Sequence, residues 1–293
     1  MQLKDLEYYV KLVQTQSYSE TASYFHLSQP AISSMVGRLE KEFSQELIIK
    51  KTRSAMHVTT AGKILYQHAL NFLKEEALLK SDLKRSQNKK FVLGYSEVAG
   101  RAWLSSVIQE LNQGKLLANL ETHQESSKRL VEHLHEGKFD AIVFTHFADQ
   151  VFKGLQVNDI EKYEFKLLVS EKSPLASAES IDIQQASDLP VIMRHKNYLS
   201  TQALQRIFAK RDFHPKKKLF LDNIDATEIL VADGLGVALR IDTGLPAPAG
   251  TRLVPLIHNQ RIYVYSALAV RSSFVPTAEH QKYLDILLKN KLH

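Results

Sequence analysis

Hydrophobic residues recur at helical spacing from the start of the chain. The first such run predicts an amphipathic helix that ends near Gln16. Ser17 and Glu20 have the spacing of a capping box, with Ser19 as an alternative cap, so a second short helix is expected to continue to about Phe25. The apolar face of the first helix consists of Leu3, Leu6, Tyr9, Val10 and Val13.

A third helix is expected almost directly after the second, over about 29–43. Ser28 is a suitable N-cap, and Pro30 is tolerated in the first turn, where its missing N–H has no intrahelical acceptor. Two short helices joined by a tight turn allow the second one to enter the DNA major groove with its N-terminal residues. Its buried face would contain Ala31, Ile32, Met35, Val36 and Leu39.

The residues that would face DNA from this helix are Gln29, Ser33 and Ser34. A glutamine can make a bidentate contact with adenine, and a serine hydroxyl can contact bases or phosphates. The same residues also suit an ordinary helix cap and surface, and helix spacing alone leaves both interpretations open.

A basic segment follows at 47–63, which contains no acidic residue. Ile48-Ile49 and Met56-x-Val58 predict two short strands around an exposed turn, which is typical of a wing beside a helix-turn-helix. Cations on such a hairpin can neutralise phosphates or enter the minor groove, with an affinity that falls as salt rises. The basic residues are Lys50, Lys51, Arg53 and Lys63.

A run without proline, from Lys63 to about Ser86, predicts one continuous helix of about six turns. One face is apolar apart from Glu76. Such a stripe pairs with a second copy or packs onto its own domain, and the sequence permits both. The stripe consists of Leu65, Ala69, Phe72, Leu79 and Leu83.

Beyond a polar hinge at 86–90 the pattern alternates between strands and helices. Strands are expected at 91–95, 117–122 and 139–144, with helices at 103–111 and 130–135 between them. This order predicts a parallel sheet with helices on its faces.

A second α/β lobe is expected to begin near Tyr163. Gly234-Leu235-Gly236 should end its last helix, and the chain then returns to the first lobe. Two such lobes leave a cleft where strand ends and helix starts converge. The expected strands are 165–169, 191–193, 219–221, 237–241 and 263–270, and the expected helices are 199–209, 224–232 and 277–288.

Polar residues on the loops that face this cleft are candidates for ligand binding. Arg194 directly follows a strand and could bind a carboxylate through two hydrogen bonds, although a surface ion pair explains it equally well. Glu97 argues against a simple anion pocket or selects a cationic group; both remain open. The candidates are Ser96, Glu97, Val98, His123, Gln124, Thr145, His146, Arg194, His195 and Asp242.

Catalysis and metal binding receive little support from motifs. The sequence has no glycine-rich phosphate loop and no Gly-x-Ser-x-Gly, and it contains no cysteine. His123, His146 and His195 could in principle meet at one cleft, but they lack the close spacing of zinc ligands. We therefore expect no enzymatic activity, no metal and no cofactor.

The composition of the chain indicates the kind of partner it suits and the compartment in which it works. The 293 residues carry a net charge of +6, which suits a polyanionic partner without proving one. The N-terminus lacks the apolar core of an export signal, no run approaches the length of about 20 apolar residues that spans a bilayer, and the absence of cysteine suits a reducing compartment. A soluble cytoplasmic protein without membrane contact is expected.

These motifs together resemble the LysR-type transcriptional regulators, strongly in the first third of the chain and moderately beyond it. Ser34 and Gly37 stand where that family often has basic or long polar side chains, and Phe43-Ser44, Ile48 and Lys50 also depart from its pattern. The matching residues are Ala22, Leu27, 28–33, Leu39-Glu40, Leu47 and 58–62, with weaker matches at 168–176, 188–190 and 232–238.

The resemblance implies an all-α winged helix-turn-helix (1–60), a dimerisation helix (61–88) and a bilobal α/β effector-binding domain like the periplasmic binding proteins (89–293). Lobe I would cover about 89–162 and 267–293, and lobe II about 163–266. It also implies a sequence-specific regulator controlled by a small-molecule effector in the cleft. The alternative is a cytoplasmic solute-binding module without a role at DNA.

The resemblance further implies partners and contacts. The partners are double-stranded promoter DNA, a small-molecule effector, RNA polymerase and further copies of the chain, as a dimer or tetramer. The apolar stripe of the long helix would form the dimer. The residues assigned to DNA binding are Ser28, Gln29, Pro30, Ser33, Ser34, Arg38, Lys51 and Arg53.

Overall fold

The computed structural model describes residues 1–50 and 56–289. The chain divides into two compact units, Met1–Lys84 and Arg85–His293, which we call the first and second units. Within the described residues, no helix combines the length and hydropathy that crossing a membrane would require.

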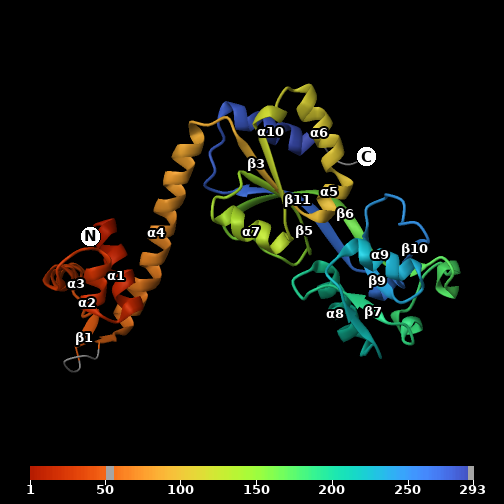
Figure 1. Cartoon of the computed structure of the whole chain (residues 1–293), viewed down its shortest axis with the longest axis horizontal. Helices are drawn as coiled ribbons and strands as arrows, with labels where there is room; N and C mark the ends of the chain where they lie inside the picture. Colours follow the sequence, from red (N-terminus) through yellow and green to blue (C-terminus); the bar gives the residue numbers. More distant parts are fainter. Residues whose placement is uncertain (51–55, 290–293) are drawn as a thin grey trace. The chain divides into compact units, whose positions relative to one another are not determined.

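The first unit contains three short helices, a two-stranded antiparallel hairpin and most of a long helix (Figure 1). Its elements are α1 (Leu3–Thr15), α2 (Tyr18–Tyr24), α3 (Gln29–Phe43), β1 (Ile48–Lys50), β2 (Met56–Val58) and α4 (Thr60–Ser86). The cap predicted for α2 is confirmed, because the hydroxyl of Ser17 accepts a hydrogen bond from the N–H of Glu20 at 3.2 Å. The predicted pair of short strands is also confirmed, with Ile48 opposite Val58.

Tyr9 ties α1 to the start of α4. Its ring is fully buried, and its hydroxyl donates a hydrogen bond to the carbonyl of Gly62 at 3.0 Å. Burial raises the pKa of Tyr9 above its ordinary value, so the hydroxyl remains a donor. A Cβ atom on Gly62 would lie 2.3 Å from the carbonyl oxygen of Leu47, so this close approach of backbones requires glycine.

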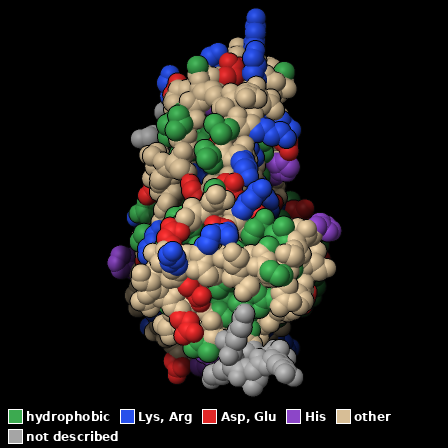
Figure 2. All heavy atoms as spheres, turned by 90° about the vertical axis from the view of Figure 1, so that its left-hand side faces the viewer, with side chains coloured by type: hydrophobic (Ala, Val, Ile, Leu, Met, Phe, Trp, Pro, Cys, Tyr) green, Lys and Arg blue, Asp and Glu red, His purple; other side chains and the backbone are tan. Residues whose placement is uncertain are grey.

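Part of the apolar stripe of α4 belongs to the core of the first unit. Leu65 and Ala69 are 9% and 0% exposed and pack in the same cluster as the buried residues of α1 and α3. Their own chain covers them, which corrects the expectation that they contact a second copy. Phe72, Leu79 and Leu83 are 49%, 57% and 59% exposed, and a dimer role for these three stays a prediction. Figure 2 shows exposed hydrophobic side chains gathered in several groups among charged ones.

One nine-stranded sheet runs through the second unit. At one end β3 pairs in parallel with β4 and β5, and at the other β7 pairs in parallel with β8 and β9. Between the two ends, β6 and β11 run antiparallel to their neighbours. The strands are β3 (Phe91–Tyr95), β4 (Leu120–Gln124), β5 (Ala141–His146), β6 (Leu155–Ser170), β7 (Val191–Met193), β8 (Lys218–Phe220), β9 (Val237–Asp242), β10 (Thr251–Pro255) and β11 (Tyr263–Arg271).

Helices cover both faces at each end of this sheet. At the end formed by β3, β4 and β5, which we call lobe I, α6 and α10 pack on one face and α7 on the other (Figure 1). At the end formed by β7, β8, β9 and β10, which we call lobe II, α8 and α9 cover opposite faces. The helices are α5 (Glu97–Ala102), α6 (Leu104–Gln113), α7 (Ser127–His135), α8 (Leu199–Arg211), α9 (Ile224–Ala232) and α10 (Ala278–Lys289).

The elements differ from the prediction mainly where the chain crosses between lobes. β6 starts at Leu155, well before the predicted start at 165, and β10 was not predicted. The first half of β6 carries many polar residues, so it lacks the apolar run that marked the other strands, although β11 pairs along its length. The first half of β6 is therefore a strand because it pairs with a strand that is distant in sequence, and the local residue pattern does not indicate this pairing.

Other elements of lobe I also begin at residues that differ from the prediction, and two of them are α7, at Ser127 instead of 130, and β5, at Ala141 instead of 139. The strand expected at 117–122 starts at Leu120, after a single 3-10 turn at Leu117–Asn119. The helix expected at 103–111 is α6, and a separate short helix, α5, precedes it with a break at Trp103. α5 brings the loop after β3 to the cleft. Gly234, with φ of 77°, ends α9 as predicted.

Candidate functional site

The N-terminus of α3 carries the residues that were expected to approach DNA. Ser28, Gln29, Pro30 and Ser34 are exposed, and Ser33 is half-buried. Ser28 occupies the N-cap position, but its side chain makes no capping hydrogen bond. The amide oxygen of Gln29 accepts a hydrogen bond from the hydroxyl of Ser19 at 3.2 Å, which links α2 to α3.

The basic residues expected to contact DNA differ in their surroundings. Arg38 forms an ion pair with the buried carboxylate of Asp5 at 2.7 Å, which joins α3 to α1 while 59% of the arginine side chain remains exposed. Arg38 therefore has a structural contact in addition to any contact with phosphate. Lys51 and Arg53 lie outside the described residues.

A cavity of about 280 Å³ lies between the two lobes of the second unit. Six of the ten residues proposed for ligand binding line it: Ser96, Glu97, Val98, Gln124, Thr145 and Arg194. Lobe I contributes the ends of β3, β4 and β5 and the starts of α5 and α7. Lobe II contributes β7, β9, α9 and the start of α8.

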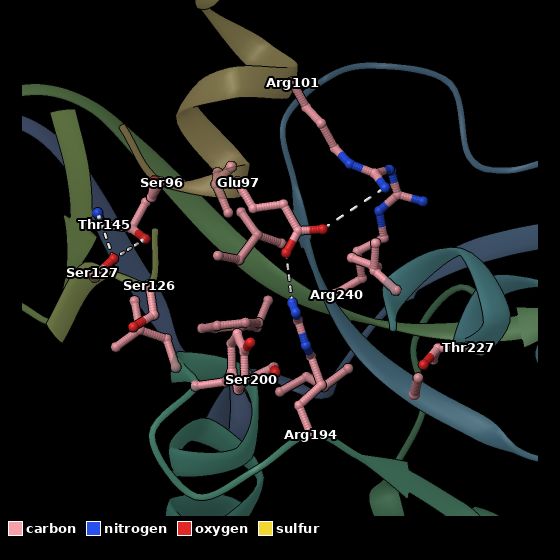
Figure 3. A pocket seen from close by; sticks show the side chains of 18 of the residues that line it. Ser96, Glu97, Arg101, Ser126, Ser127, Thr145, Arg194, Ser200, Thr227 and Arg240 are labelled. Carbon is pink, nitrogen blue, oxygen red and sulfur yellow. Dashed lines mark hydrogen bonds and ion pairs between the residues drawn. The ribbon is translucent and has the colours of Figure 1, made fainter. Parts of the chain in front are cut away.

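Arg194 and Glu97 face each other across this cavity (Figure 3). The Nη1 atom of Arg194 lies 2.6 Å from Oε2 of Glu97, and the two side chains are 18% and 22% exposed. Arg194 also donates a hydrogen bond to the carbonyl of Asp222 at 2.9 Å and stacks on the ring of Tyr198 at 3.7 Å. Two contacts within lobe II thus orient Arg194 independently of its contact with Glu97.

A second charged cluster was not predicted from the sequence. Oε1 of Glu228 lies 2.8 Å from Nη1 of Arg240 and 3.2 Å from Nη1 of Arg101, so one carboxylate serves two guanidinium groups. Nη2 of Arg101 lies 3.2 Å from the exposed Asp225. Burial lowers the pKa of Arg240, against the opposing effect of Glu228. A sequence signal existed, since Arg240 interrupts the apolar strand run at 237–241.

Three arginines and three glutamates line the cavity. Three arginines, Arg101, Arg194 and Arg240, surround two glutamates, Glu97 and Glu228. Glu125 also lines the cavity, but its carboxylate pairs with His133 at 2.9 Å, away from the arginines. Asp225 pairs with Arg101 in addition, so three carboxylates, Glu97, Glu228 and Asp225, match the three arginines.

Hydroxyl groups and helix starts line the rest of the cavity. The hydroxyl of Ser127, at the start of α7, accepts a hydrogen bond from the backbone N–H of Thr145 at 3.2 Å, which fixes α7 against β5 (Figure 3). Neither Ser126 nor Tyr198, the N-cap residues of α7 and α8, makes a side-chain capping bond. In the same view Ser96 and Ser126 lie on one side of Glu97, and Thr227 lies on the other side, beyond Arg240.

Two of the remaining candidates lie away from this cavity. His123 sits on the edge strand β4, and its Nε2 lies 2.5 Å from the carboxylate of Glu121. His146 is buried beside Phe144, and its ring nitrogens contact Asp159 at 2.9 Å and the carbonyl of Phe147 at 3.0 Å. The expectation that these histidines face the ligand is therefore corrected, because contacts with a carboxylate and with neighbouring rings hold each one elsewhere.

His195 and Asp242 also fall outside the cavity lining. The backbone N–H of His195 donates to Asp222 at 2.7 Å, and its side chain borders a neighbouring groove. Lys166 lies 2.5 Å from the carboxylate of Asp242. Burial would raise the pKa of Asp242, but hydrogen bonds from Lys166 and from the N–H of Gly244 lower it below its usual range.

The three histidines considered as zinc ligands lie in three different surroundings. Among residues 1–50 and 56–289 no group of three or more His, Cys, Asp or Glu side chains is arranged to hold a metal ion. The cavity is lined by guanidinium, carboxylate and hydroxyl groups.

Each of the two units matches a protein-family model. Residues 3–63 match the model of the bacterial regulatory helix-turn-helix proteins of the lysR family, and residues 84–291 match the LysR substrate binding domain. Among curated proteins, the chain is 23% identical over 289 residues to the malolactic fermentation system transcriptional activator of Lactococcus lactis, covering 98% of each chain. It is 25% identical to the nitrogen assimilation regulatory protein nac of Escherichia coli, covering 82% of this chain and 78% of the other.

Solved structures share the fold. Full-length OxyR from Pseudomonas aeruginosa is 20% identical with a TM-score of 0.57, and the match covers 98% of both chains. The effector-binding domain of QuiR in complex with shikimate is 17% identical with a TM-score of 0.57, covering 69% of this chain and 96% of that domain.

Proposed function

Because the chain belongs to the LysR family of bacterial transcriptional regulators, we propose that its interlobe cavity binds a small hydroxylated organic anion as the effector. The family assignment makes the chain a regulator with a DNA-binding helix-turn-helix and an effector-binding domain. It overturns the alternative of a solute-binding module without a role at DNA. The proposal concerns what the cavity recognises and how recognition reaches DNA.

The observation that carries the effector class is the cluster of three partly buried guanidinium groups in the cavity. Arginines that are 14% to 33% exposed lose much of their hydration, so an anionic ligand that pairs with their guanidinium groups compensates for this loss. A carboxylate matches the fork geometry of a guanidinium in two parallel hydrogen bonds. Arg194 is the primary anchor, because Tyr198 and Asp222 already orient it.

The hydroxyl-rich lining favours an effector that itself carries hydroxyl groups. Serine and threonine hydroxyls both donate and accept, so they pair readily with ligand hydroxyls. The free N–H groups at the start of α7 and α8 add donors at the cavity wall. Shikimate, which the QuiR effector domain holds, is a monocarboxylate with three hydroxyls and therefore a suitable probe of this class.

The proposed site binds its ligand without converting it and needs no cofactor. Glu97 and Glu228, two of the glutamates that line the cavity, are each held by guanidinium groups. A carboxylate held in this way is a weak general base.

Regulation follows if the effector binds two lobe arrangements with unequal affinity, since a ligand shifts only an equilibrium that it distinguishes. We propose that the chain binds promoter DNA as a dimer or tetramer, with α3 in the major groove. When the effector shifts the lobe arrangement, the arrangement of the subunits in the oligomer changes with it. This change then alters DNA bending and the contact with RNA polymerase. Two recognition helices about one DNA turn apart would read a pseudo-palindrome.

The effector proposal is tested by calorimetric titration of the full-length chain with shikimate and with its methyl ester. The ester keeps every hydroxyl but removes the charge. Binding of shikimate with at least tenfold weaker binding of the ester supports an anion site. Equal binding of both compounds, or binding of neither, overturns the proposed class.

The DNA proposal is tested by selection from randomised duplexes, followed by mobility shifts at several salt concentrations. We expect an enriched pseudo-palindrome whose affinity falls steeply as salt rises, because phosphate contacts release counterions. No enrichment at low salt would contradict specific binding by α3.

A further inference from the structure

We infer that Glu97 is a tethered anion that occupies the effector's place at Arg194, so that the effector binds by displacing it. This inference rests on the proposed effector class and concerns how the same site is regulated. It makes Glu97 the residue that sets the affinity threshold of the sensor.

The geometry around Arg194 supports this role. The arginine keeps two contacts within lobe II, the carbonyl of Asp222 at 2.9 Å and the ring of Tyr198 at 3.7 Å. Its Nη1 atom points across the cavity and donates a hydrogen bond to Oε2 of Glu97 at 2.6 Å. The guanidinium is therefore held in place whichever carboxylate it meets at Nη1.

Glu97 has a second partner ready in its own helix. Arg101 follows it by four residues on α5, and Nη2 of Arg101 lies 3.8 Å from Oε1 of Glu97. A small rotation of the glutamate side chain would exchange Arg194 for Arg101. The effector carboxylate then pairs with Arg194, and Glu97 shares Arg101 with Asp225 and Glu228, the last of which also keeps Arg240.

The exchange also changes what holds the two lobes together. α5 belongs to lobe I, yet Val98 and Ala102 pack against the hydrophobic cluster of lobe II. The Glu97 to Arg194 pair and the Arg101 pairs with Glu228 and Asp225 are ionic links between α5 and lobe II. Displacing Glu97 removes one of these links and replaces it with a contact through the ligand.

Removing the internal competitor should therefore tighten binding. Glu97→Gln keeps the size and polarity of the side chain but removes its charge, so shikimate no longer competes with a carboxylate at Arg194. We expect its dissociation constant to fall about tenfold, within the range of one charge-assisted hydrogen bond. The neutral methyl ester does not compete with Glu97, and its affinity should change less than twofold.

The test is calorimetric titration of full-length wild type, Glu97→Gln and Glu97→Ser with both compounds. Glu97→Ser provides a second variant with a small polar side chain, should Glu97→Gln fail to fold. Asp188→Asn is the matched control, because it removes one carboxylate from an exposed ion pair with Lys216, outside the cavity lining. This control should leave both affinities unchanged.

The outcomes separate the inference from the proposed function. Tighter shikimate binding in the Glu97 variants alone supports the inference. Shikimate binding by wild type that is equal or weaker in the Glu97 variants overturns the inference and leaves the effector class standing. Tightening that also occurs in Asp188→Asn, or for the ester, overturns it as well, and binding by no variant overturns both.

Discussion

The guanidinium of Arg194 stacks on the ring of Tyr198, with its central carbon 3.7 Å from the ring centre. The flat face is thus covered, and the edge with its N–H groups is directed at a carbonyl and a carboxylate. A lysine cannot reproduce this arrangement, because an ammonium is a point charge without a planar fork.

Arg194→Lys should therefore weaken shikimate binding about tenfold, and Arg194→Met about a hundredfold, since charge-assisted hydrogen bonds contribute roughly 1.5–3 kcal/mol. Calorimetry measures both. Arg206→Lys is the control, because Arg206 also stacks on an aromatic ring, that of Phe147, but does not line the cavity. Equal losses in Arg206→Lys would show that the effect is not local to the site.

Gly62→Ala should destabilise the first unit. The added Cβ would lie 2.3 Å from the Leu47 carbonyl and 2.6 Å from the Tyr9 hydroxyl, so backbone or core must shift. We expect the free energy of unfolding in urea to fall by about 1–3 kcal/mol, the usual cost of overpacking. Gly37→Ala on α3 is the control; nothing lies within 4 Å of its Cβ, and it should gain roughly 0.5–1 kcal/mol from helix propensity. An unchanged free energy of unfolding in Gly62→Ala would contradict the close approach of α4 to the hairpin at this position.

Gln29→Ala should relax base preference at one position of each half-site. An amide that contacts adenine through two bonds contributes about 1–3 kcal/mol of discrimination, whereas phosphate contacts do not depend on sequence. Binding to the selected palindrome and to single-base variants can be compared by fluorescence anisotropy. Ser19→Ala serves as a control, since it removes the hydrogen bond that holds Gln29 without removing the amide. An unchanged base preference in Gln29→Ala would place the readout elsewhere.

Leu79→Glu, combined with Leu83→Glu, should weaken self-association. Both side chains are more than half exposed on α4, and burying a carboxylate in an apolar dimer seam is strongly unfavourable. Sedimentation velocity over a concentration series should show a shift toward monomer. Val151→Glu introduces the same charge at a residue that is 86% exposed and lies outside α4. A dimer that survives the double substitution would mean that α4 does not form the interface.

The stability of the second unit should depend on Asp182 in a pH-dependent way. Burial alone would raise the pKa of Asp182, but hydrogen bonds from the N–H of Gln184, the amide of Gln260 and Arg211 lower it. Its stabilisation is therefore fully present above the unfolded pKa of about 4 and is lost as the pH falls through the lower folded pKa.

Asp182→Asn should accordingly lower the midpoint of urea unfolding at pH 7, and the difference from wild type should shrink below about pH 4. Asp188→Asn provides the comparison, since its carboxylate pairs with Lys216 at the exposed surface. A difference for Asp182→Asn that does not depend on pH would contradict the ion-pair explanation.

The amino-acid sequence by itself determined the first unit and most regular elements of the second. Hydrophobic periodicity and caps are local signals, so the bounds of α3, β3, β7 and α9 agree with the prediction. The same signals identified the strand ends that approach a cleft, and with them Arg194 and Glu97.

Tertiary structure alone decided the charge pattern of the site. Arg101, Glu228 and Arg240 come from α5, α9 and β9, and only the crossing of β6 and β11 between the lobes brings these elements together. It also directed His123 and His146 away from the cavity and enclosed Leu65 within its own domain. The physical reason is that periodicity reports which face of an element is apolar, whereas the partner of a charged side chain depends on distant segments that no local pattern encodes.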